Sequence, residues 1–510
     1  MFQKRLLISE LRKCFGNDIE FKERLLFSQH HLSHAASAFF PSPFESSAVL
    51  TMDGVGEWAT TTISVGSGNK LNILNEIRFP HSLGLLYSAF TFFTGFKVNS
   101  GEYKLMGLAP YGKPIFVDLI MENLVDVKDD GSFFLNMEYF DYCAGSRMTN
   151  RKFELLFDGP PREPESPITQ RELDLAASIQ KVTEEIILKI CRHIKAVSGE
   201  RNLCLAGGVA LNCVANGRIL QEGIFENIWI QPASGDAGGA LGAALSVYFS
   251  VLENPRALTA GSDTMHGAYL GPQFSQKEVE DQLTKLGAKF SSYSSSEMIE
   301  ITAQALANGK TIGWMQGRME YGPRALGARS IIADARSENM QRLLNQQVKF
   351  RESFRPFAPS VLEEKASDFF DLKGESPYML LTVPVSQQVR MVPSEVGDSN
   401  GLVELLNQSR SLIPAVTHVD YSARVQTVKR ETNPTYHELL TKFNDLTGCP
   451  VIINTSFNVR SEPIVCTPED AYRCFMGTDL DLLVVNNSIL EKNNQPAELR
   501  EVYFGKFTLD

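Results

Sequence analysis

Two units of strand, glycine turn and helix most strongly limit the folds that this 510-residue chain can adopt. The first unit runs from a predicted strand at 203–205 to a helix that begins near Val209. The second runs from a strand at 228–230 to a helix of small residues over 237–249. The segment 174–197, which precedes both units, is predicted to be a helix because its apolar residues recur about every 3.6 positions. Helices that alternate with strands indicate an α/β fold.

The turns of these two units carry paired glycines, which indicate a nucleotide-binding edge. Backbone amides at such a turn can approach a phosphate or a ribose, and the dipole of the following helix favours the anion. Close packing of the strand on the helix is the alternative, and it is the more frequent reason for one Gly-Gly pair. Two such turns in one domain favour a nucleotide cleft. The predicted cofactor-binding residues of these turns are Gly207, Gly208, Asn212, Gly235 and Gly238.

Upstream of these units the sequence predicts a helix, three strands and a second helix. A His-rich helix over 27–40 leads to a short apolar strand at 48–52. Strands at 60–65 and 71–79 flank a Gly-Ser-Gly-Asn turn and predict a β-hairpin. The segment 84–96 is apolar and aromatic, which predicts a buried helix.

A second domain is expected, since 510 residues exceed what one hydrophobic core usually organises. The segment 252–271 is rich in Pro, Gly, Ser and Thr and predicts a linker. We therefore expect one domain over 1–265 and another over 266–510. The second is also predicted to be α/β, with strands at 311–314, 378–383, 415–417 and 451–454.

The composition favours a cytoplasmic globular protein. Apolar residues make up 43% and charged residues 21% of the chain, and the formal net charge of −11 argues against nucleic-acid binding. The eight cysteines form no CxxC pair, which is typical of reduced thiols. No apolar run reaches the roughly 18 residues of a membrane helix, and the start has no signal-peptide core. We expect no membrane and no nucleic-acid partner.

Two histidines and two aspartates predict a metal site. His30 and His34 lie one turn apart on one face if their segment is helical. Asp53 closes the first predicted strand, and Asp236 lies at a strand-to-helix turn. Such a set of nitrogen and oxygen ligands suits Fe(II), Zn(II) or a similar ion. The alternative is that the histidines cover a core and that Asp236 caps the helix after it.

Basic residues recur in two short segments of the second domain, at 317–330 and 349–359. Arginine forks match phosphate and carboxylate oxygens in pairs, and lysine adds a point charge. A solvated basic face is the alternative, but interleaved Gly, Pro, Phe and Tyr favour an anion pocket with walls. Arg424 and the segment 454–458 can add donors. The segment 100–112 is predicted to be a loop that lines a binding site, or a plain turn.

Several long motifs closely resemble those of the ATP-dependent O-carbamoyltransferases of natural-product biosynthesis. That family modifies aminoglycosides, cephamycins, nodulation factors and saxitoxin-like alkaloids. The motifs run in order over nearly the whole chain, and several are idiosyncratic. They read HHLSHAASAFFPSPF, LTMDGVGEWATT, FPHSLGLLYSAF, SGEYKLMGLAPYG, LAGGVALNCVANG, ASGDAGGALGAAL, GRMEYGPRALGARSI, KFRESFRPFAPSV and NTSFN.

The resemblance implies two catalytic domains. The first would have the actin-like, sugar-kinase ATPase fold of the threonylcarbamoyl transferase that modifies tRNA. The second would resemble the threonylcarbamoyl-adenylate synthase fold and make carbamoyl-adenylate from carbamoyl phosphate and ATP with Mg²⁺. The first domain would then transfer the carbamoyl group to an alcohol of a small molecule or sugar. A homodimer is a further expectation.

The resemblance also assigns residues. The implied metal ligands, for Fe²⁺ or another divalent ion, are His30, His34, Asp53 and Asp236. The implied catalytic residues, which would bind the phosphate-bearing substrates, are Arg324, Lys349, Arg355, Arg424 and Ser456. Asn454 is expected to bind the cofactor.

Members of the resembled family have a longer segment ahead of the HHxxH motif, with the first phosphate loop of the actin-like fold. Here 29 residues precede His30. We therefore expect a shortened first domain, in which carbamoyl transfer survives less readily than adenylate formation in the second. Two other functions stay open. They are tRNA threonylcarbamoylation, which the negative net charge disfavours, and an inactive nucleotide- or metal-binding remnant.

Overall fold

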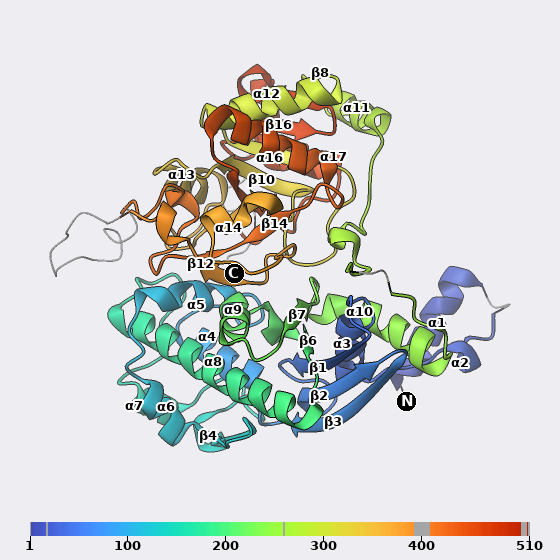
Figure 1. The fold of residues 1–510 in the computed structure, drawn as a ribbon, viewed down its shortest axis with the longest axis vertical. Coiled ribbons are helices and arrows are strands. Elements are labelled where there is room, and N and C mark those ends of the chain that lie inside the picture. The colour runs from blue at the N-terminus through green and yellow to red at the C-terminus, as the bar shows by residue number, and fades with distance from the viewer. Residues whose placement is uncertain (1, 17–18, 259–260, 392–407, 501–506, 508–510) are drawn as a thin grey trace.

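The computed structural model describes residues 2–16, 19–258, 261–391, 408–500 and 507, and it has two stacked lobes (Figure 1). The first lobe holds the elements from α3 (His30–Phe39) to α10 (Asp236–Leu245), and the second lobe holds those from α11 (Gln276–Lys285) to β17 (Ser488–Glu491). Each lobe mixes helices with strands, as the sequence predicts. The domain boundary after position 265 stays a prediction, and Thr259 and Ala260 of the predicted linker lie outside the described residues.

A five-stranded mixed sheet forms the centre of the first lobe, in the order β3-β2-β1-β6-β7. β1 pairs antiparallel with β2 and parallel with β6. The predicted hairpin and the three other predicted strands are confirmed, with small shifts at their ends. The strands are β1 (Ser46–Met52), β2 (Ala59–Ser67), β3 (Lys70–Arg78), β6 (Asn202–Ala206) and β7 (Asn227–Ile230), and a separate ribbon has β4 (Val125–Val127) and β5 (Phe133–Leu135).

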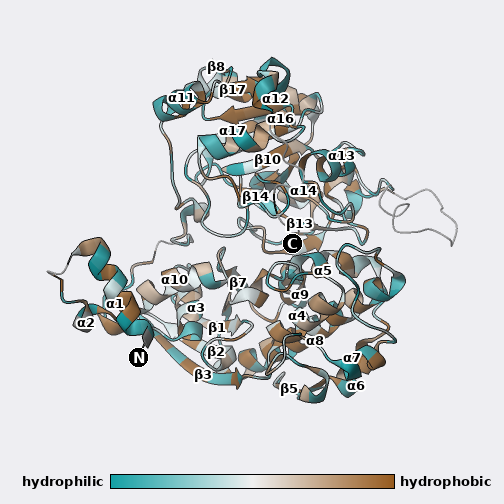
Figure 2. Cartoon of the chain, turned by 180° about the vertical axis from the view of Figure 1, so that it is seen from behind, coloured by the Kyte–Doolittle hydropathy of each residue, from teal (hydrophilic) through white to brown (hydrophobic). Residues whose placement is uncertain are grey.

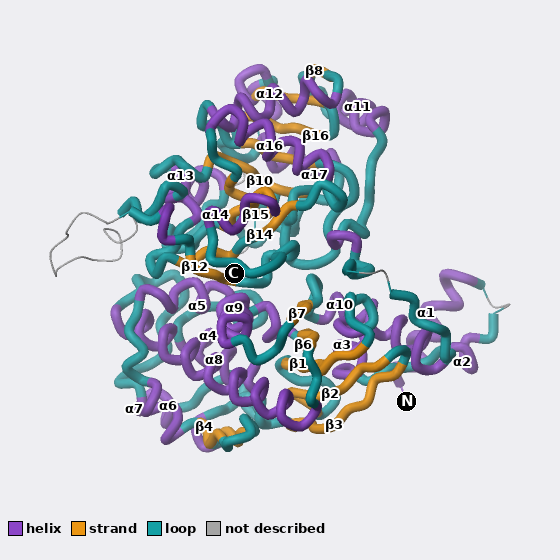
Figure 3. The backbone as a smooth tube through the Cα atoms, viewed as in Figure 1, coloured by secondary structure: helices purple, strands orange, loops and turns teal. Residues whose placement is uncertain are grey.

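Helices α3 and α8 contact β1 of this sheet, whereas Figure 3 shows α1 and α2 to one side of it. The long helix α8 starts at a capping box formed by Thr169 and Glu172 and ends at Gly199, whose φ of 67° is left-handed. The predicted helices over 27–40, 84–96 and 174–197 are confirmed. The helices are α1 (Phe2–Phe15), α2 (Phe21–Arg24), α3 (His30–Phe39), α4 (Leu83–Phe93), α5 (Glu102–Leu108), α6 (Val117–Asn123), α7 (Arg151–Leu156), α8 (Gln170–Ser198), α9 (Cys213–Glu222) and α10 (Asp236–Leu245).

The second lobe is built on an eight-stranded sheet in the order β14-β11-β15-β10-β9-β16-β17-β8. The strands predicted at 311–314 and 451–454 are confirmed as two of its inner members, β9 and β15. The strands of this sheet are β8 (Ser291–Ser292), β9 (Ile312–Met315), β10 (Arg329–Asp334), β11 (Ala358–Leu362), β14 (Gln426–Val428), β15 (Val451–Ser456), β16 (Leu482–Val485) and β17 (Ser488–Glu491). A small ribbon pairs β12 (Thr382–Pro384) with β13 (Ser422–Arg424).

Apolar residues follow the inner strands of this lobe, while outer helices such as α11 are hydrophilic (Figure 2). Its helices are α11 (Gln276–Lys285), α12 (Ser295–Ala307), α13 (Met340–Leu343), α14 (Ala366–Phe369), α16 (Pro434–Thr447) and α17 (Pro468–Met476). Among the described residues of both lobes, no helix combines the length and apolarity needed to cross a bilayer.

Two strands predicted for the second lobe are wrong in whole or in part. The strand predicted at 415–417 is a 3₁₀ turn over Pro414–Val416, because proline has no amide hydrogen to offer a neighbouring strand. The strand predicted at 378–383 is reduced to the residues of β12. Met379 has a φ of 54°, which interrupts an extended run.

Two segments of the first lobe also differ from the sequence prediction. The segment 100–112, predicted to be a loop, contains α5 and a 3₁₀ turn over Ala109–Tyr111. Its glycines lie at the ends and near the last turn, so they do not prevent a helix of Glu, Tyr, Lys, Leu and Met. The helix expected near Val209 begins at Cys213, after a 3₁₀ turn over Gly208–Leu211.

Candidate functional site

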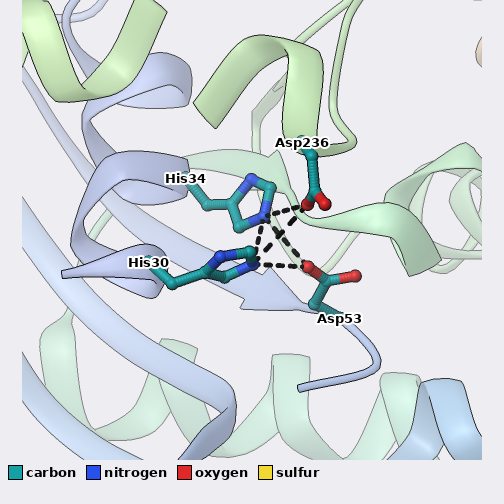
Figure 4. A group of neighbouring side chains, drawn as sticks. All are labelled: His30, His34, Asp53 and Asp236. Atoms are coloured by element: carbon teal, nitrogen blue, oxygen red, sulfur yellow. Dashed lines mark hydrogen bonds and ion pairs between the residues drawn. The ribbon is translucent and has the colours of Figure 1, made fainter. Parts of the chain in front are cut away.

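The four predicted metal ligands come together at one end of the first-lobe sheet (Figure 4). His30 and His34 project from the first turns of α3, Asp53 follows β1, and Asp236 begins α10. α10 can pack closely on α3 because Gly242 has no side chain, since a Cβ there would overlap the carbonyl oxygen of Ser33.

The ligand atoms converge on one point. Nε2 of His30 lies 2.8 Å, and Nε2 of His34 lies 3.0 Å, from Oδ2 of Asp53. The two Nε2 atoms are 3.1 Å apart, and each lies 3.6 Å from Oδ1 of Asp236. Ligands about 2.0–2.2 Å from one divalent ion lie roughly 3 Å from one another. The spacing and the set of two imidazoles and two carboxylates therefore fit a divalent cation.

Backbone amides fix the carboxylate of Asp53. Its Oδ1 accepts hydrogen bonds from the amides of Gly54 at 2.9 Å and Gly208 at 3.2 Å, which leaves Oδ2 directed at the histidines. Burial opposes ionisation of Asp53, but the hydrogen bonds with His30 and His34 hold its pKa well below the usual range. The same contact with Asp53 raises the pKa of His30. The four predicted ligands, which we call the metal quartet, thus present ionised carboxylate oxygen next to imidazole nitrogen.

Two residues that the sequence analysis missed hold the histidine helix in place. Glu57 accepts the backbone amide of His30 on both carboxylate oxygens at 3.2 Å. Thr51 lies 2.7 Å from Nδ1 of His31, the buried neighbour of the ligands. Burial and then His34 lower the pKa of His31 to about 4, so this ring is neutral at pH 7. His31 therefore supports the site without carrying charge.

The glycine turns have more than one role. Gly207 has a φ of 89°, and a Cβ there would overlap the carbonyl oxygen of Met52, so close packing explains this glycine. Gly238 packs in the same way on the carbonyl of Ala233. Asn212 caps α9 through its Oδ1 and donates its Nδ2 to Gln180 at 3.0 Å.

A cavity of about 930 Å³ lies between the lobes, and we name it the interlobe chamber. Asp53, Gly208 and Asn212 line it from the first lobe. Gly207, Gly235 and Gly238 are not among its described lining residues, and their cofactor-binding role stays a prediction. The lining from the second lobe contains all five residues predicted to be catalytic, together with Asn454. They are Arg324, Lys349, Arg355, Arg424 and Ser456.

The interlobe chamber is positively charged in a protein whose net charge is −11. Its described lining contains seven Lys and Arg residues against four carboxylates. Burial, followed by the charge of Arg424, lowers the pKa of Arg324 to about 9. Among the described residues, the buried Nε of Arg324 has no hydrogen-bond partner. A guanidinium in this position suits an anionic ligand.

Lys349, which lines the chamber, is held in place by hydrogen bonds from its ammonium. It is buried, and its Nζ donates to the carbonyls of Ser456 at 2.8 Å and Asn458 at 2.7 Å, and to Oδ1 of Asn458 at 2.7 Å. Burial and the charge of Arg351 lower the pKa of Lys349 well below its usual range. Ser456 also donates its hydroxyl to Oδ1 of Asn458 at 2.7 Å. Lys349 is therefore fixed by the end of β15.

A buried carboxylate shapes the loop that carries Arg324. Oε1 of Glu320 accepts the backbone amides of Leu326 and Ala328 at 2.7 Å and of Arg329 at 3.2 Å. Burial raises the pKa of Glu320 despite these bonds. The sequence analysis missed this residue, although the Gly-Pro pair between Glu320 and Arg324 signals a turn.

Asn454, the sixth predicted residue of this lobe, is buried on the inner strand β15. Its Nδ2 donates to Gln426 at 2.8 Å, and among the described residues its Oδ1 has no hydrogen-bond partner. Gln426 in turn donates to the carbonyl of Leu326, at the end of the Glu320 loop. Asn454 is thus tied to the loop that carries Arg324.

Comparison with known proteins assigns both halves of the chain. The family model described as the carbamoyltransferase N-terminus matches residues 2–245, and the one described as the carbamoyltransferase C-terminus matches residues 303–492. The protein sll1178 of Synechocystis, described as uncharacterized, is 58% identical over 99% of this chain and 82% of its own length.

Two nodulation proteins are also similar over most of the chain. Nodulation protein NolNO of Sinorhizobium fredii is 40% identical over 97% of this chain and 68% of its own length. Nodulation protein NolO of Bradyrhizobium diazoefficiens is 38% identical over 92% of this chain and 80% of its own length.

Proposed function

This chain belongs to the carbamoyltransferase family and is a transferase, and on that premise we propose that it is an ATP-dependent O-carbamoyltransferase. The second lobe makes carbamoyl-adenylate, and the first lobe transfers the carbamoyl group to a hydroxyl of a small molecule or sugar. The observation that carries the proposal is the shared interlobe chamber. Asp53 of the metal quartet and the buried cations of the second lobe line the same cavity.

In the second lobe, the cations bind the crowded phosphate oxygens of the substrates. Water first hydrolyses carbamoyl phosphate to inorganic phosphate and carbamate. A carbamate oxygen then attacks the α-phosphorus of ATP, and pyrophosphate leaves. Arg324, Lys349 and Arg355 are placed to offset the negative charge that this step concentrates.

In the first lobe, the acceptor hydroxyl attacks the carbamoyl carbon, AMP leaves, and the hydroxyl proton is released. Asp53 and Asp236 supply carboxylate oxygens and His30 and His34 supply imidazole nitrogens for Fe²⁺ or another divalent cation. Such a cation would supply Lewis acidity, which would favour the negative charge that develops during transfer and ease deprotonation of the acceptor hydroxyl. The amides of Gly54 and Gly208 keep Asp53 oriented for this role.

The test combines exchange and product analysis on the full chain. Carbamoyl phosphate should be required for exchange of labelled pyrophosphate into ATP, and a panel of alcohols with both substrates should yield one product with the mass gain of a carbamate. Transfer to an alcohol without exchange would refute the adenylate route. ATP turnover that depends on threonine and tRNA would instead identify threonylcarbamoylation. Metal analysis should find about one divalent ion per chain, and absence of both metal and turnover would indicate a remnant.

A further inference from the structure

A segment of the first lobe lies beside the Lys and Arg residues of the second lobe that line the interlobe chamber. We call these residues the basic cluster, and they are Arg324, Lys349, Arg351, Arg355, Arg424 and Arg460. The interlobe segment, residues 97–104, contains the start of α5. Five of its residues line the interlobe chamber together with the cations of the second lobe, and they are Lys97, Asn99, Ser100, Glu102 and Tyr103. The first lobe thus supplies part of the lining next to the cations of the second lobe.

Tyr103 contacts one of these cations directly. The guanidinium carbon of Arg355 lies 4.6 Å from the centre of the Tyr103 ring, a separation typical of a cation–π interaction. The side chain of Arg355 is 13% exposed. A flexible arginine in this position is therefore supported on one face by an aromatic ring from the other lobe.

Lys104 acts on the same arginine through a carboxylate. Its ammonium is fully buried and lies 3.3 Å from Oε1 of Glu352. Oε2 of Glu352 lies 3.6 Å from Arg355, and Arg460 lies 3.5 Å from Oε1. Burial opposes the ionisation of Glu352, but the charges of Lys104 and Arg355 lower its pKa. One carboxylate is thus shared by three cations.

We propose that the first lobe completes the anion site of the second, with Tyr103 and Lys104 as positioning residues that hold Arg355. The proposal rests on the proposed function only in taking the ligand to be a phosphate-bearing substrate. It makes the interlobe segment part of substrate binding, so that the second lobe alone has an unfinished site.

Other contacts between the lobes hold them together without involving the charged side chains of the chamber. Tyr111 donates its hydroxyl to the carbonyl of Phe354 at 3.1 Å, and Asn216 donates its Nδ2 to the carbonyl of Leu380 at 3.0 Å. Neither involves a charged side chain of the chamber. Tyr111→Phe is therefore a matched control, because it removes an interlobe hydrogen bond but none of the contacts that Tyr103 and Glu352 make with the Arg355 side chain.

The test measures binding of inorganic pyrophosphate and of inorganic phosphate to the full chain by calorimetry, without turnover. Tyr103→Leu should raise the dissociation constant of one or both about fivefold, and Tyr103→Phe should restore it. Lys104→Met should weaken binding about tenfold, and Lys104→Arg should recover most of it. Tyr111→Phe should stay within about twofold of the wild type.

Two results would overturn the proposal. One is unchanged binding of both anions in Tyr103→Leu, a variant that buries no new charge and serves even if Lys104→Met does not fold. The other is an equal loss in Tyr111→Phe, which would make the effect one of general lobe packing. A wild-type protein that binds pyrophosphate but shows no exchange dependent on carbamoyl phosphate would refute the proposed function and leave the composite site standing.

Discussion

The metal quartet and the basic cluster differ in the elements that carry them and in the charges that they bring together. The quartet is carried by regular elements, namely the first turns of α3, the end of β1 and the start of α10. The basic cluster is carried mostly by loops and strand ends of the second lobe. The quartet brings opposite charges together, whereas the cluster brings like charges together.

This difference decides what each site needs from its ligand. In the quartet Asp53 is already stabilised by two histidines, and the side chain of Asp236 is 82% exposed, so the site is open to solvent on the side of Asp236. In the cluster Lys349 is tied to backbone carbonyls and Arg324 is kept next to Arg424 at an electrostatic cost. A preorganised cluster of this kind stabilises its ligand more than it stabilises the fold.

The sharpest separation between the two sites comes from His34→Ala, the largest effect that we expect. Loss of an imidazole ligand removes several kcal/mol of stabilisation of transition-state charge, so transfer to the acceptor should fall about a thousandfold. Exchange of pyrophosphate into ATP should stay within about twofold, because His34 is not among the described residues that line the chamber. Transfer is followed with the alcohol that gains a carbamate in the wild-type reaction, and bound metal is measured in parallel.

His193→Ala is the matched control, since it removes an imidazole from α8, a helix of which no described residue lines the chamber. It should retain both metal and transfer. An equal loss of exchange in His34→Ala would break the division of labour between the lobes.

The basic cluster should behave in the opposite way in activity and in stability. Arg324→Met should lower exchange roughly a hundredfold, because one donor to the phosphate oxygens is lost. The same change should raise the urea midpoint of unfolding. Burial lowers the pKa of this guanidinium to about 9 in the folded protein. Since pH 7 lies below both the folded and the unfolded pKa, the group is protonated in both states, and the cost of burying its charge lowers the free energy of unfolding of the wild type. A variant that loses exchange and stability together would contradict this account.

Glu320→Gln tests whether the loop geometry matters apart from the cations. The three backbone amides would bond to a neutral amide oxygen instead of a carboxylate, and relief of the burial that raises the pKa of Glu320 would offset part of this loss, so we expect the free energy of unfolding to fall by about 1 kcal/mol. Displacement of Arg324 should lower exchange about tenfold, with the larger part in the KM for carbamoyl phosphate. Glu338→Gln, on the exposed surface of the same lobe, is the control. Full exchange in Glu320→Gln would show that the loop holds its shape without the carboxylate.

The sequence predicted the quartet better than it predicted the architecture of the cluster. His30 and His34 are one helical turn apart, and Asp53 and Asp236 lie where elements end and begin, so local patterns pointed to all four. Four cations of the chamber, Arg324, Lys349, Arg355 and Arg424, were also predicted from their motifs, whereas Lys97, Arg351 and Arg460 were given no role. What holds them was not, since Glu352 meets Lys104 only through the packing of two lobes.

The elements of the fold divide in a similar way. Long periodic segments such as α8 and the hairpin of β2 and β3 were predicted, because their patterns repeat over many residues. The segment around Met379 was not, since its positive φ depends on tertiary contacts rather than on the residue type. Gly207 packs on Met52, as the alternative to phosphate binding requires, and its cofactor-binding role stays a prediction. Cytoplasmic location and a homodimer stay predictions.

The smallest expected effect concerns a carboxylate among the cations and is visible only with pH. Burial would raise the pKa of Asp420, but hydrogen bonds from His418 and Ser422 lower it to about 2. A depressed pKa stabilises the fold above the unfolded value of 3.8, and this contribution is lost as the pH falls toward 2. The side chain is 45% exposed, so screening limits it to about 1 kcal/mol. Asp420→Asn should therefore be less stable than the wild type by that amount at pH 7 in urea titrations, and the difference should shrink below about pH 4. A difference that is constant with pH would mean that Asp420 contributes through packing, unlike the charge-coupled carboxylate of Asp53.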